Sequence, residues 1–165
     1  MEQFDLVDRD DNVIGTTDKR TAHANKQLHR VAAVYVFNDV GELYVQVHKT
    51  GGGLYDHSVG GHVSKGEDYA TAASREADEE LGIKQPLTHL SNFYSDEGVY
   101  LHMFGLFECI AEKNWQFVPN EEVEEIIPMK LDVIKELMKT RPEKFTGGFI
   151  NTMREYTKIK NKTSL

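Results

Sequence analysis

One stretch of 23 residues, from Gly61 to Ile83, constrains the fold of this chain more than any other part of its sequence. A glycine-rich run precedes it, and alanines recur within it at helical spacing. Asp68 can cap the start of a helix here, and Gly82 can end it in the left-handed conformation. We therefore expect a helix from about Asp68 to Leu81 that packs closely on a sheet through an apolar stripe of Ala70, Ala73, Ala77 and Leu81.

Three acids of this helix, Glu76, Glu79 and Glu80, should project to one side, at the edge of its buried face. Like charges at these spacings cost about 0.2–0.5 kcal/mol per pair, and a bound cation removes that cost. Mg²⁺ prefers carboxylate and phosphate oxygens. Gly60 and Gly61 let the backbone approach a ligand, so that a carbonyl can join the coordination. The pattern predicts a magnesium site.

Charge and composition exclude several other classes of protein. The formal net charge is −8, and half of it lies between Gly61 and Ile83, which argues against a large nucleic-acid-binding surface. No apolar run reaches the roughly 18–20 residues of a membrane span, and the first residues do not resemble a secretory signal. The single cysteine, Cys109, excludes a disulfide framework and indicates a reducing compartment. We expect a cytoplasmic protein without membrane or nucleic-acid partners.

The remaining sequence predicts one α/β domain over residues 1–165, with a mixed sheet between helices. A polar stretch up to His29 separates the first strands from the rest. The clearest hairpin joins Val31–Phe37 to Leu43–Val47. The other expected strands are Phe4–Val7, Val13–Ile14, Thr88–Tyr94, Tyr100–Ile110 and Val123–Ile127, the last ended by Pro128, and the other expected helices are Leu131–Met138 and Phe149–Tyr156.

The full string resembles the Nudix box, which is glycine, five residues, glutamate, seven residues, then Arg-Glu-apolar-x-Glu-Glu-x-Gly-apolar. Gly61, Glu67 and the run Arg75 to Ile83 fill every defined position. The resemblance implies a Nudix-type α/β/α sandwich that holds Mg²⁺ or Mn²⁺ against a diphosphate. It implies that Glu76 and Glu80 bind the metal, with Glu79 helping directly or through water, and that Glu67 pairs with Arg75 to orient these ligands.

The implied reaction is hydrolysis of a diphosphate linkage in a nucleoside diphosphate derivative or a related small organic diphosphate, with a metal-activated water as nucleophile. The box does not contain the general base, and the acids outside it that qualify are Glu97, Glu121 and Glu122. Tyr55 and His62, in and after the glycine-rich loop, are candidates for contacts with the substrate. Homodimers are common in the family, and no pattern here specifies one.

Longer strings resemble the branch of this superfamily that contains isopentenyl diphosphate isomerase. They are LHRVAAVYVFNDVGELYVQVH, DHSVGGHVSKGE and PEKFTGGF. His23, His29 and His62 approximate the metal-binding histidines of that enzyme, which suggests a second metal site, whereas His48, His89 and His102 are interpreted as ordinary polar residues. The isomerase needs a cysteine where Gly60 stands, so hydrolysis is favoured. Isomerisation and non-catalytic diphosphate binding remain the alternatives.

Overall fold

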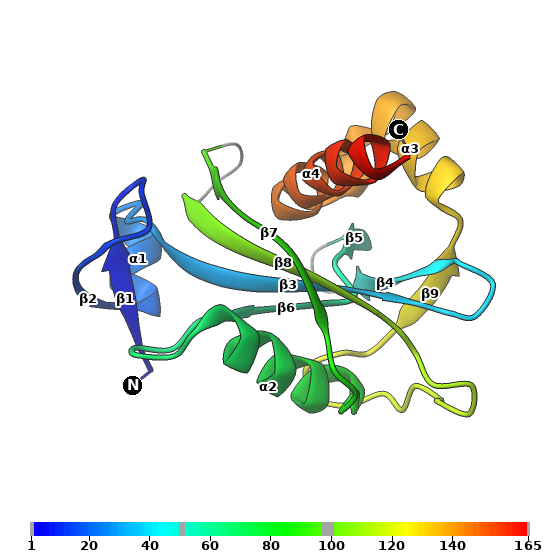
Figure 1. The fold of residues 1–165 in the computed structure, drawn as a ribbon, viewed down its shortest axis with the longest axis horizontal. Coiled ribbons are helices and arrows are strands. Elements are labelled where there is room, and N and C mark those ends of the chain that lie inside the picture. The colour runs from blue at the N-terminus through cyan, green and yellow to red at the C-terminus, as the bar shows by residue number, and fades with distance from the viewer. Residues whose placement is uncertain (1, 50–51, 97–100, 165) are drawn as a thin grey trace.

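The computed structural model describes residues 2–49, 52–96 and 101–164. Nine strands within these ranges form one mixed sheet, with helix α2 (Tyr69–Leu81) on one face and α3 (Leu131–Thr140) and α4 (Gly147–Thr163) on the other (Figure 1). This is the α/β/α sandwich that the sequence predicts. No helix within the described ranges is both long and apolar enough to cross a membrane.

Strand β3 (His29–Phe37) organises the sheet. It pairs antiparallel with β6 (Val59–His62) and in parallel with β8 (His102–Ile110), and its end joins β4 (Leu43–His48) in the predicted hairpin. Its side chains alternate between the two faces. Ala32, Val34 and Val36 enter the core beneath α2, whereas Tyr35 and its same-face neighbours enter the core beneath α3 and α4. Strand β3 is therefore buried on both sides.

The N-terminal unit stands at one end of the sheet (Figure 1). It consists of β1 (Gln3–Val7), β2 (Val13–Asp18) and α1 (Lys19–Ala24). The sequence predicted only a polar stretch where α1 lies, because six residues show no clear helical periodicity. The helix forms because the Asp18 side chain accepts a hydrogen bond from the Thr21 amide and thereby caps it.

The remaining elements are β5 (Leu54–Asp56), β7 (Thr88–Ser95), β9 (Ile126–Met129) and a 3₁₀ turn at Pro142–Lys144. The prediction for β9 was wrong at both ends, since the strand begins at Ile126 instead of Val123 and Pro128 lies within it, opposite Tyr44. Proline is tolerated there because β9 has β4 as its only strand partner among the described residues, so the position needs no second ladder hydrogen bond.

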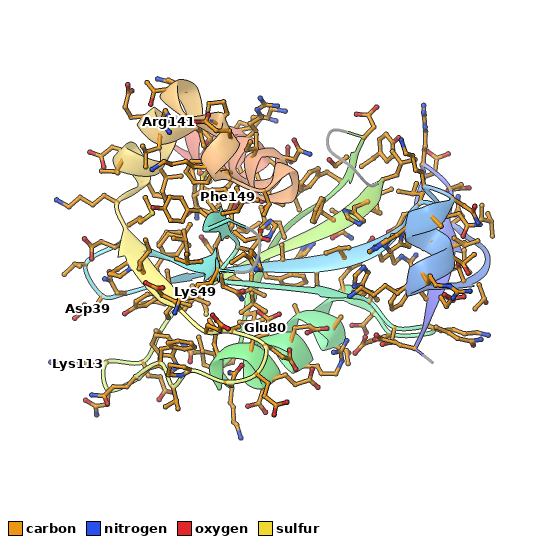
Figure 2. All side chains as sticks on the ribbon, turned by 180° about the vertical axis from the view of Figure 1, so that it is seen from behind. Asp39, Lys49, Glu80, Lys113, Arg141 and Phe149 are labelled. Carbon is orange, nitrogen blue, oxygen red and sulfur yellow. The ribbon has the colours of Figure 1, made fainter. Side chains whose placement is uncertain are left out.

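The two cores lie on opposite faces of the sheet. Figure 2 shows Glu80 of α2 on one side and Phe149 of α4 on the other. Phe149 is fully buried, as expected for a residue in the core beneath α4. Glu80 is only 7% exposed, although it is a carboxylate. A carboxylate held inside an apolar face marks the site described next.

Candidate functional site

The sequence predicted both ends of helix α2, but not every residue of its buried stripe. Asp68 caps it, with the Thr71 amide donating to the Asp68 carboxylate, and Gly82 ends it at φ 64°, as predicted. The expected stripe was wrong at Ala70, which is exposed. Tyr69 packs on the sheet instead, on the helix face that is centred between Glu76 and Glu80. It lies so close to Gly105 that a Cβ at that glycine would be 2.5 Å from the Tyr69 ring.

Glu76 and Glu80 therefore lie within the buried face and not at its edge. Strand β6 makes room for them, because a Cβ at Gly61 would stand 2.0 Å from Cδ of Glu76. Only glycine allows that carboxylate its position. Gly61 thus contributes to the site by having no side chain, which leaves space for the Glu76 carboxylate.

A third carboxylate reaches the same point from another element. Glu122 lies in the loop between β8 and β9, and one carboxylate oxygen each from Glu76, Glu80 and Glu122 lies within 4.8 Å of the others. Glu122 was one of three predicted candidates for the base. Glu121, beside it, is outside this group, and Glu97 lies outside the described residues. Glu79 lines the same pocket, half-exposed.

Arg75 connects the acids of the site through hydrogen bonds. Its Nε and Nη2 donate to the two oxygens of Glu67 at 3.0 Å each, and its Nη1 donates to Glu76 at 2.7 Å and to Glu79 at 3.3 Å. Nη2 also donates to the carbonyl of His62 at 3.2 Å, which ties α2 to β6. The structure thus places Glu67 and Arg75 in the paired arrangement expected of them, with Glu76 as a further partner.

Burial changes the protonation of the cluster. It raises the pKa of Glu80 to about 8 and raises the pKa of Glu76 above its usual value, while the neighbouring acids add repulsion. Gln46 of β4 opposes this effect by donating from Nε2 to the Glu80 carboxylate. Two buried carboxylates with raised pKa values beside a third acid are the donor set that a hard divalent cation neutralises.

The carboxylates line a pocket of about 420 Å³. Lys19, Arg75, Gly60 and Gly61 also line it, and His62 is among its walls, so the predicted ligand and glycine residues share one cavity. Tyr55 does not appear among the described residues of this lining. It packs against Phe145, with ring centroids 5.4 Å apart, because side chains alternate along β5 and the pocket side belongs to its neighbour Asp56. The prediction of Tyr55 as a substrate contact lacks support from this arrangement.

The pocket lining also includes a carboxylate between two imidazoles, which the sequence gave no reason to expect. His48 Nε2 lies 3.0 Å from Asp56 Oδ2, and His57 Nδ1 lies 2.7 Å from Asp56 Oδ1. His57 Nε2 lies 2.8 Å from the hydroxyl of Thr152 in α4. Burial alone would raise the pKa of Asp56, but the two histidines hold it well below its usual range, and Asp56 in turn raises the pKa of His48. This part of the lining therefore holds an ionised carboxylate that two imidazoles contact.

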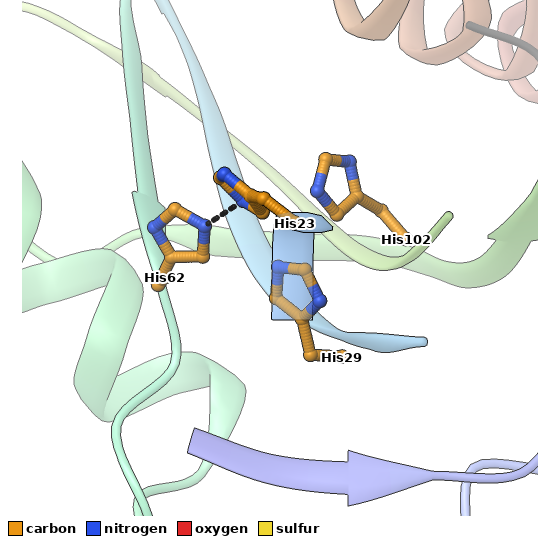
Figure 3. Close-up of side chains that lie close together, drawn as sticks. All are labelled: His23, His29, His62 and His102. Carbon is orange, nitrogen blue, oxygen red and sulfur yellow. Dashed lines mark hydrogen bonds between the residues drawn. The ribbon is translucent and has the colours of Figure 1, made fainter. Parts of the chain in front are cut away.

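A second cluster contains only imidazoles. Figure 3 shows His23, His29, His62 and His102 turned toward one another, and one ring nitrogen of each lies within 4.8 Å of the others. The sequence had grouped the first three and set His102 aside. One sequence feature could have predicted that His102 belongs to this cluster, because His29 and His102 each begin a long apolar strand. Parallel pairing of β3 with β8 places these two residues opposite each other.

The comparisons with known proteins agree with this geometry. Residues 27–147 match the family model of the NUDIX domain. An uncharacterized Nudix hydrolase of Yersinia pestis is 31% identical over 93% of this chain and 84% of its own length. An isopentenyl-diphosphate Delta-isomerase of Pectobacterium atrosepticum is 31% identical over 87% of this chain and 85% of its own. A crystal structure from Deinococcus radiodurans has the same fold, with a TM-score of 0.74 at 24% identity over 93% of this chain and 98% of that one.

Proposed function

The chain belongs to the Nudix family, and on that premise we propose that it hydrolyses a diphosphate linkage in a small nucleotide-like or related organic diphosphate, with Mg²⁺ or Mn²⁺ as cofactor. The observation that carries the proposal is the convergence of Glu76, Glu80 and Glu122 in one pocket, with the first two buried. Buried carboxylates are costly unless a cation compensates them.

The residues present fit such a cofactor. Glu76 and Glu80 would hold it through carboxylate oxygens, and Gly61 leaves the space that the Glu76 side chain occupies. When bound, the cation supplies Lewis acidity, which polarises the phosphoryl oxygens and lowers the pKa of the attacking water. Arg75 orients Glu76 and Glu79 through its hydrogen bonds to both.

We assign proton acceptance from the attacking water to Glu122. Its carboxylate lies close enough to Glu76 and Glu80 to reach a water between them, whereas its side chain is exposed and comes from a separate loop. The substrate phosphates would meet Lys19 in the same pocket, where its ammonium group offsets charge that the acids alone would repel.

Double-bond isomerisation is the rival, because relatives of this length carry the isomerase name. The chain offers no thiol in the pocket for it. Its only cysteine, Cys109, is buried in β8 in the core beneath α2, where burial raises the pKa of the thiol to about 11. Gly60 occupies the position at which the isomerase branch has its cysteine. These observations favour hydrolysis.

A phosphate-release screen with Mg²⁺ or Mn²⁺ tests the proposal. The panel holds nucleoside di- and triphosphates, nucleotide sugars, dinucleotides, coenzyme A and isopentenyl diphosphate. We expect turnover of one class, reduced at least ~10²-fold in Glu80→Gln, as for loss of an essential metal ligand, and nearly unchanged in Glu121→Gln. Isomerised isopentenyl diphosphate, or tight binding of a diphosphate with no turnover, would contradict the proposal.

A further inference from the structure

The loop between β8 and β9, residues 111–125, runs past the C-terminal end of helix α2 (Figure 1). It carries Glu122, which is exposed and lies outside the helices and strands, so no regular backbone ladder fixes its position. A catalytic group must nevertheless be held to within roughly 0.5 Å of its productive position. Contacts of the loop itself therefore have to set where Glu122 lies relative to the carboxylates of α2.

The end of α2 offers hydrogen-bond acceptors to this loop. The last carbonyls of a helix have no partner within the helix, and the cap at Gly82 uses carbonyls further back in the helix. The loop supplies donors for the two that follow. Asn120 Nδ2 donates to the carbonyl oxygen of Glu80 at 2.8 Å, and Trp115 Nε1 donates to that of Leu81 at 3.0 Å. The loop is thus attached to the last turn of α2 at two points.

Asn120 also folds the turn that carries Glu122. Its Oδ1 accepts hydrogen bonds from the amide of Glu122 at 2.9 Å and from the amide of Val123 at 2.8 Å. Its own amide donates to the carbonyl of Val123 at 3.0 Å, which closes the turn. Val123 in turn is buried in the core beneath α2. One planar side-chain amide therefore joins the backbone of Glu80 to the backbone of Glu122.

The partners of Asn120 require both halves of an amide. Backbone amides only donate and a carbonyl only accepts, so the side chain must present an acceptor on one side and a donor on the other. Ionised aspartate would keep the acceptor but turn an oxygen toward the Glu80 carbonyl, and alanine would provide neither group. Because Asn120 is exposed, its hydrogen bonds compete with water and add little to global stability. Their loss should displace the turn and leave the fold intact.

We propose that Asn120 is a positioning residue of the active site, which sets the place of Glu122 relative to Glu80 by binding the backbone of both. The inference rests on the proposed hydrolysis, in which Glu122 accepts a proton from the attacking water. Trp115 makes a comparable bond to α2 five residues before the turn and packs on Tyr44, with ring centroids 5.1 Å apart. Trp115 anchors the loop as a whole, whereas Asn120 bonds the turn itself.

A double-mutant cycle in kcat tests the proposal. Asn120→Ala should lower kcat by roughly 10–10²-fold, the scale of a small misplacement of a catalytic group. KM should change little, because Asn120 is not among the described residues that line the pocket. In the Glu122→Gln background the same change should have almost no further effect, since the group that Asn120 positions is already lost. Asn120→Asp, which keeps the acceptor for the Glu122 amide, should fall between wild type and Asn120→Ala.

Trp115→Phe is the matched control, because it keeps a ring against Tyr44 and loses only the donor to the Leu81 carbonyl. Its kcat should stay close to that of the wild type. An unchanged kcat in Asn120→Ala, or equal losses from Asn120→Ala with and without Glu122→Gln, would overturn the proposal. A loss in Trp115→Phe as large as in Asn120→Ala would do the same, since any loosening of the loop would then suffice.

Amide hydrogen exchange tests the placement without turnover. The amides of Glu122 and Val123 should exchange at least ~3-fold faster in Asn120→Ala, because both lose their acceptor, while protection of α2 stays as in the wild type. Unchanged exchange at both amides would overturn the proposal. The expected change in exchange, together with a wild type that hydrolyses nothing in the panel, would place the failure in the hydrolase proposal and not in the role of Asn120 in the loop.

Discussion

The carboxylate cluster and the histidine cluster are both groups of buried ionisable residues, and strand β6 contributes to each through adjacent residues. Gly61 makes room for Glu76, and His62 joins the imidazoles. Burial disfavours the charged form in both places, raising the pKa of Glu80 to about 8 and lowering those of His62 and His102 to about 3. The consequences for metal binding are opposite.

A neutral glutamic acid must lose its proton before it binds a cation, whereas a neutral imidazole already offers its lone pair. The carboxylate cluster also lines an open pocket together with Lys19, a cation for phosphate, while the histidine cluster lies beneath Phe4 and contributes only His62 to the described lining of that pocket. Cation binding at the carboxylate cluster should therefore depend on pH through the ionisation of Glu80, whereas the neutral imidazoles need no loss of a proton to act as ligands. The predictions below test this contrast.

Removal of the proposed base should have the largest effect. Glu122→Gln should lower kcat by about 10²–10⁴-fold, the contribution expected of a general base. The neighbouring Glu121→Gln is the matched control and should change kcat little, because Glu121 is outside the carboxylate group. Steady-state kinetics across pH should also show the acidic limb of the wild-type profile altered in Glu122→Gln, because a general base is inactive once it is protonated. Equal rates in the two variants would remove Glu122 from the mechanism.

A pair of glycine substitutions tests the geometry of the same site. Gly61→Ala should lower turnover by roughly 10–10²-fold, because its Cβ would displace the Glu76 carboxylate and small misplacements of catalytic groups are costly. In Gly60→Ala the nearest atom to the new Cβ is His57 Nδ1 at 3.5 Å, an ordinary contact. Circular dichroism should show both variants folded. If Gly60→Ala lost as much activity as Gly61→Ala, crowding of Glu76 would not be the explanation.

The two clusters also differ in how far the sequence predicted them. The carboxylates of α2 were predictable because residue spacing, an N-cap at Asp68 and a left-handed glycine at position 82 are local features. The burial of Glu80 could not be predicted, since it depends on which side of helix α2 packs against the sheet. Glu122 lies in a loop without periodicity, and only the chain path brings it to the site.

The histidine cluster was predicted in part, for the same physical reason. His23, His29 and His62 were grouped through the resemblance, but His102 is 40 residues beyond His62 and was interpreted as an ordinary polar residue. Its position depends on the parallel register between β3 and β8, a long-range pairing that no local pattern specifies. Helix α1, which supplies His23, was missed because its cap at Asp18 is the main signal in six residues.

The smallest effect, and the one that compares the clusters most directly, is the pH dependence of stability in metal-free protein. Between pH 4.5 and about 8 the folded state keeps the Glu80 proton longer than the unfolded chain does, so stability falls as pH rises through this window. Between about 3 and 6.5 the unfolded chain binds the His62 and His102 protons that the folded state excludes, so stability falls as pH drops.

The metal-free protein should therefore be most stable near the middle of these windows, and thermal unfolding at several pH values in EDTA measures it. Each kcal/mol should shift Tm by about 2–4 °C for a chain of this size. Glu80→Gln should flatten the alkaline side alone, because glutamine has no proton to lose, and Mg²⁺ should raise the wild-type Tm there by binding the ionised carboxylates. If Glu80→Gln instead flattened the acid side, or left both sides unchanged, the two clusters would not be titrating independently, and the contrast between buried acids and buried imidazoles would lose its basis.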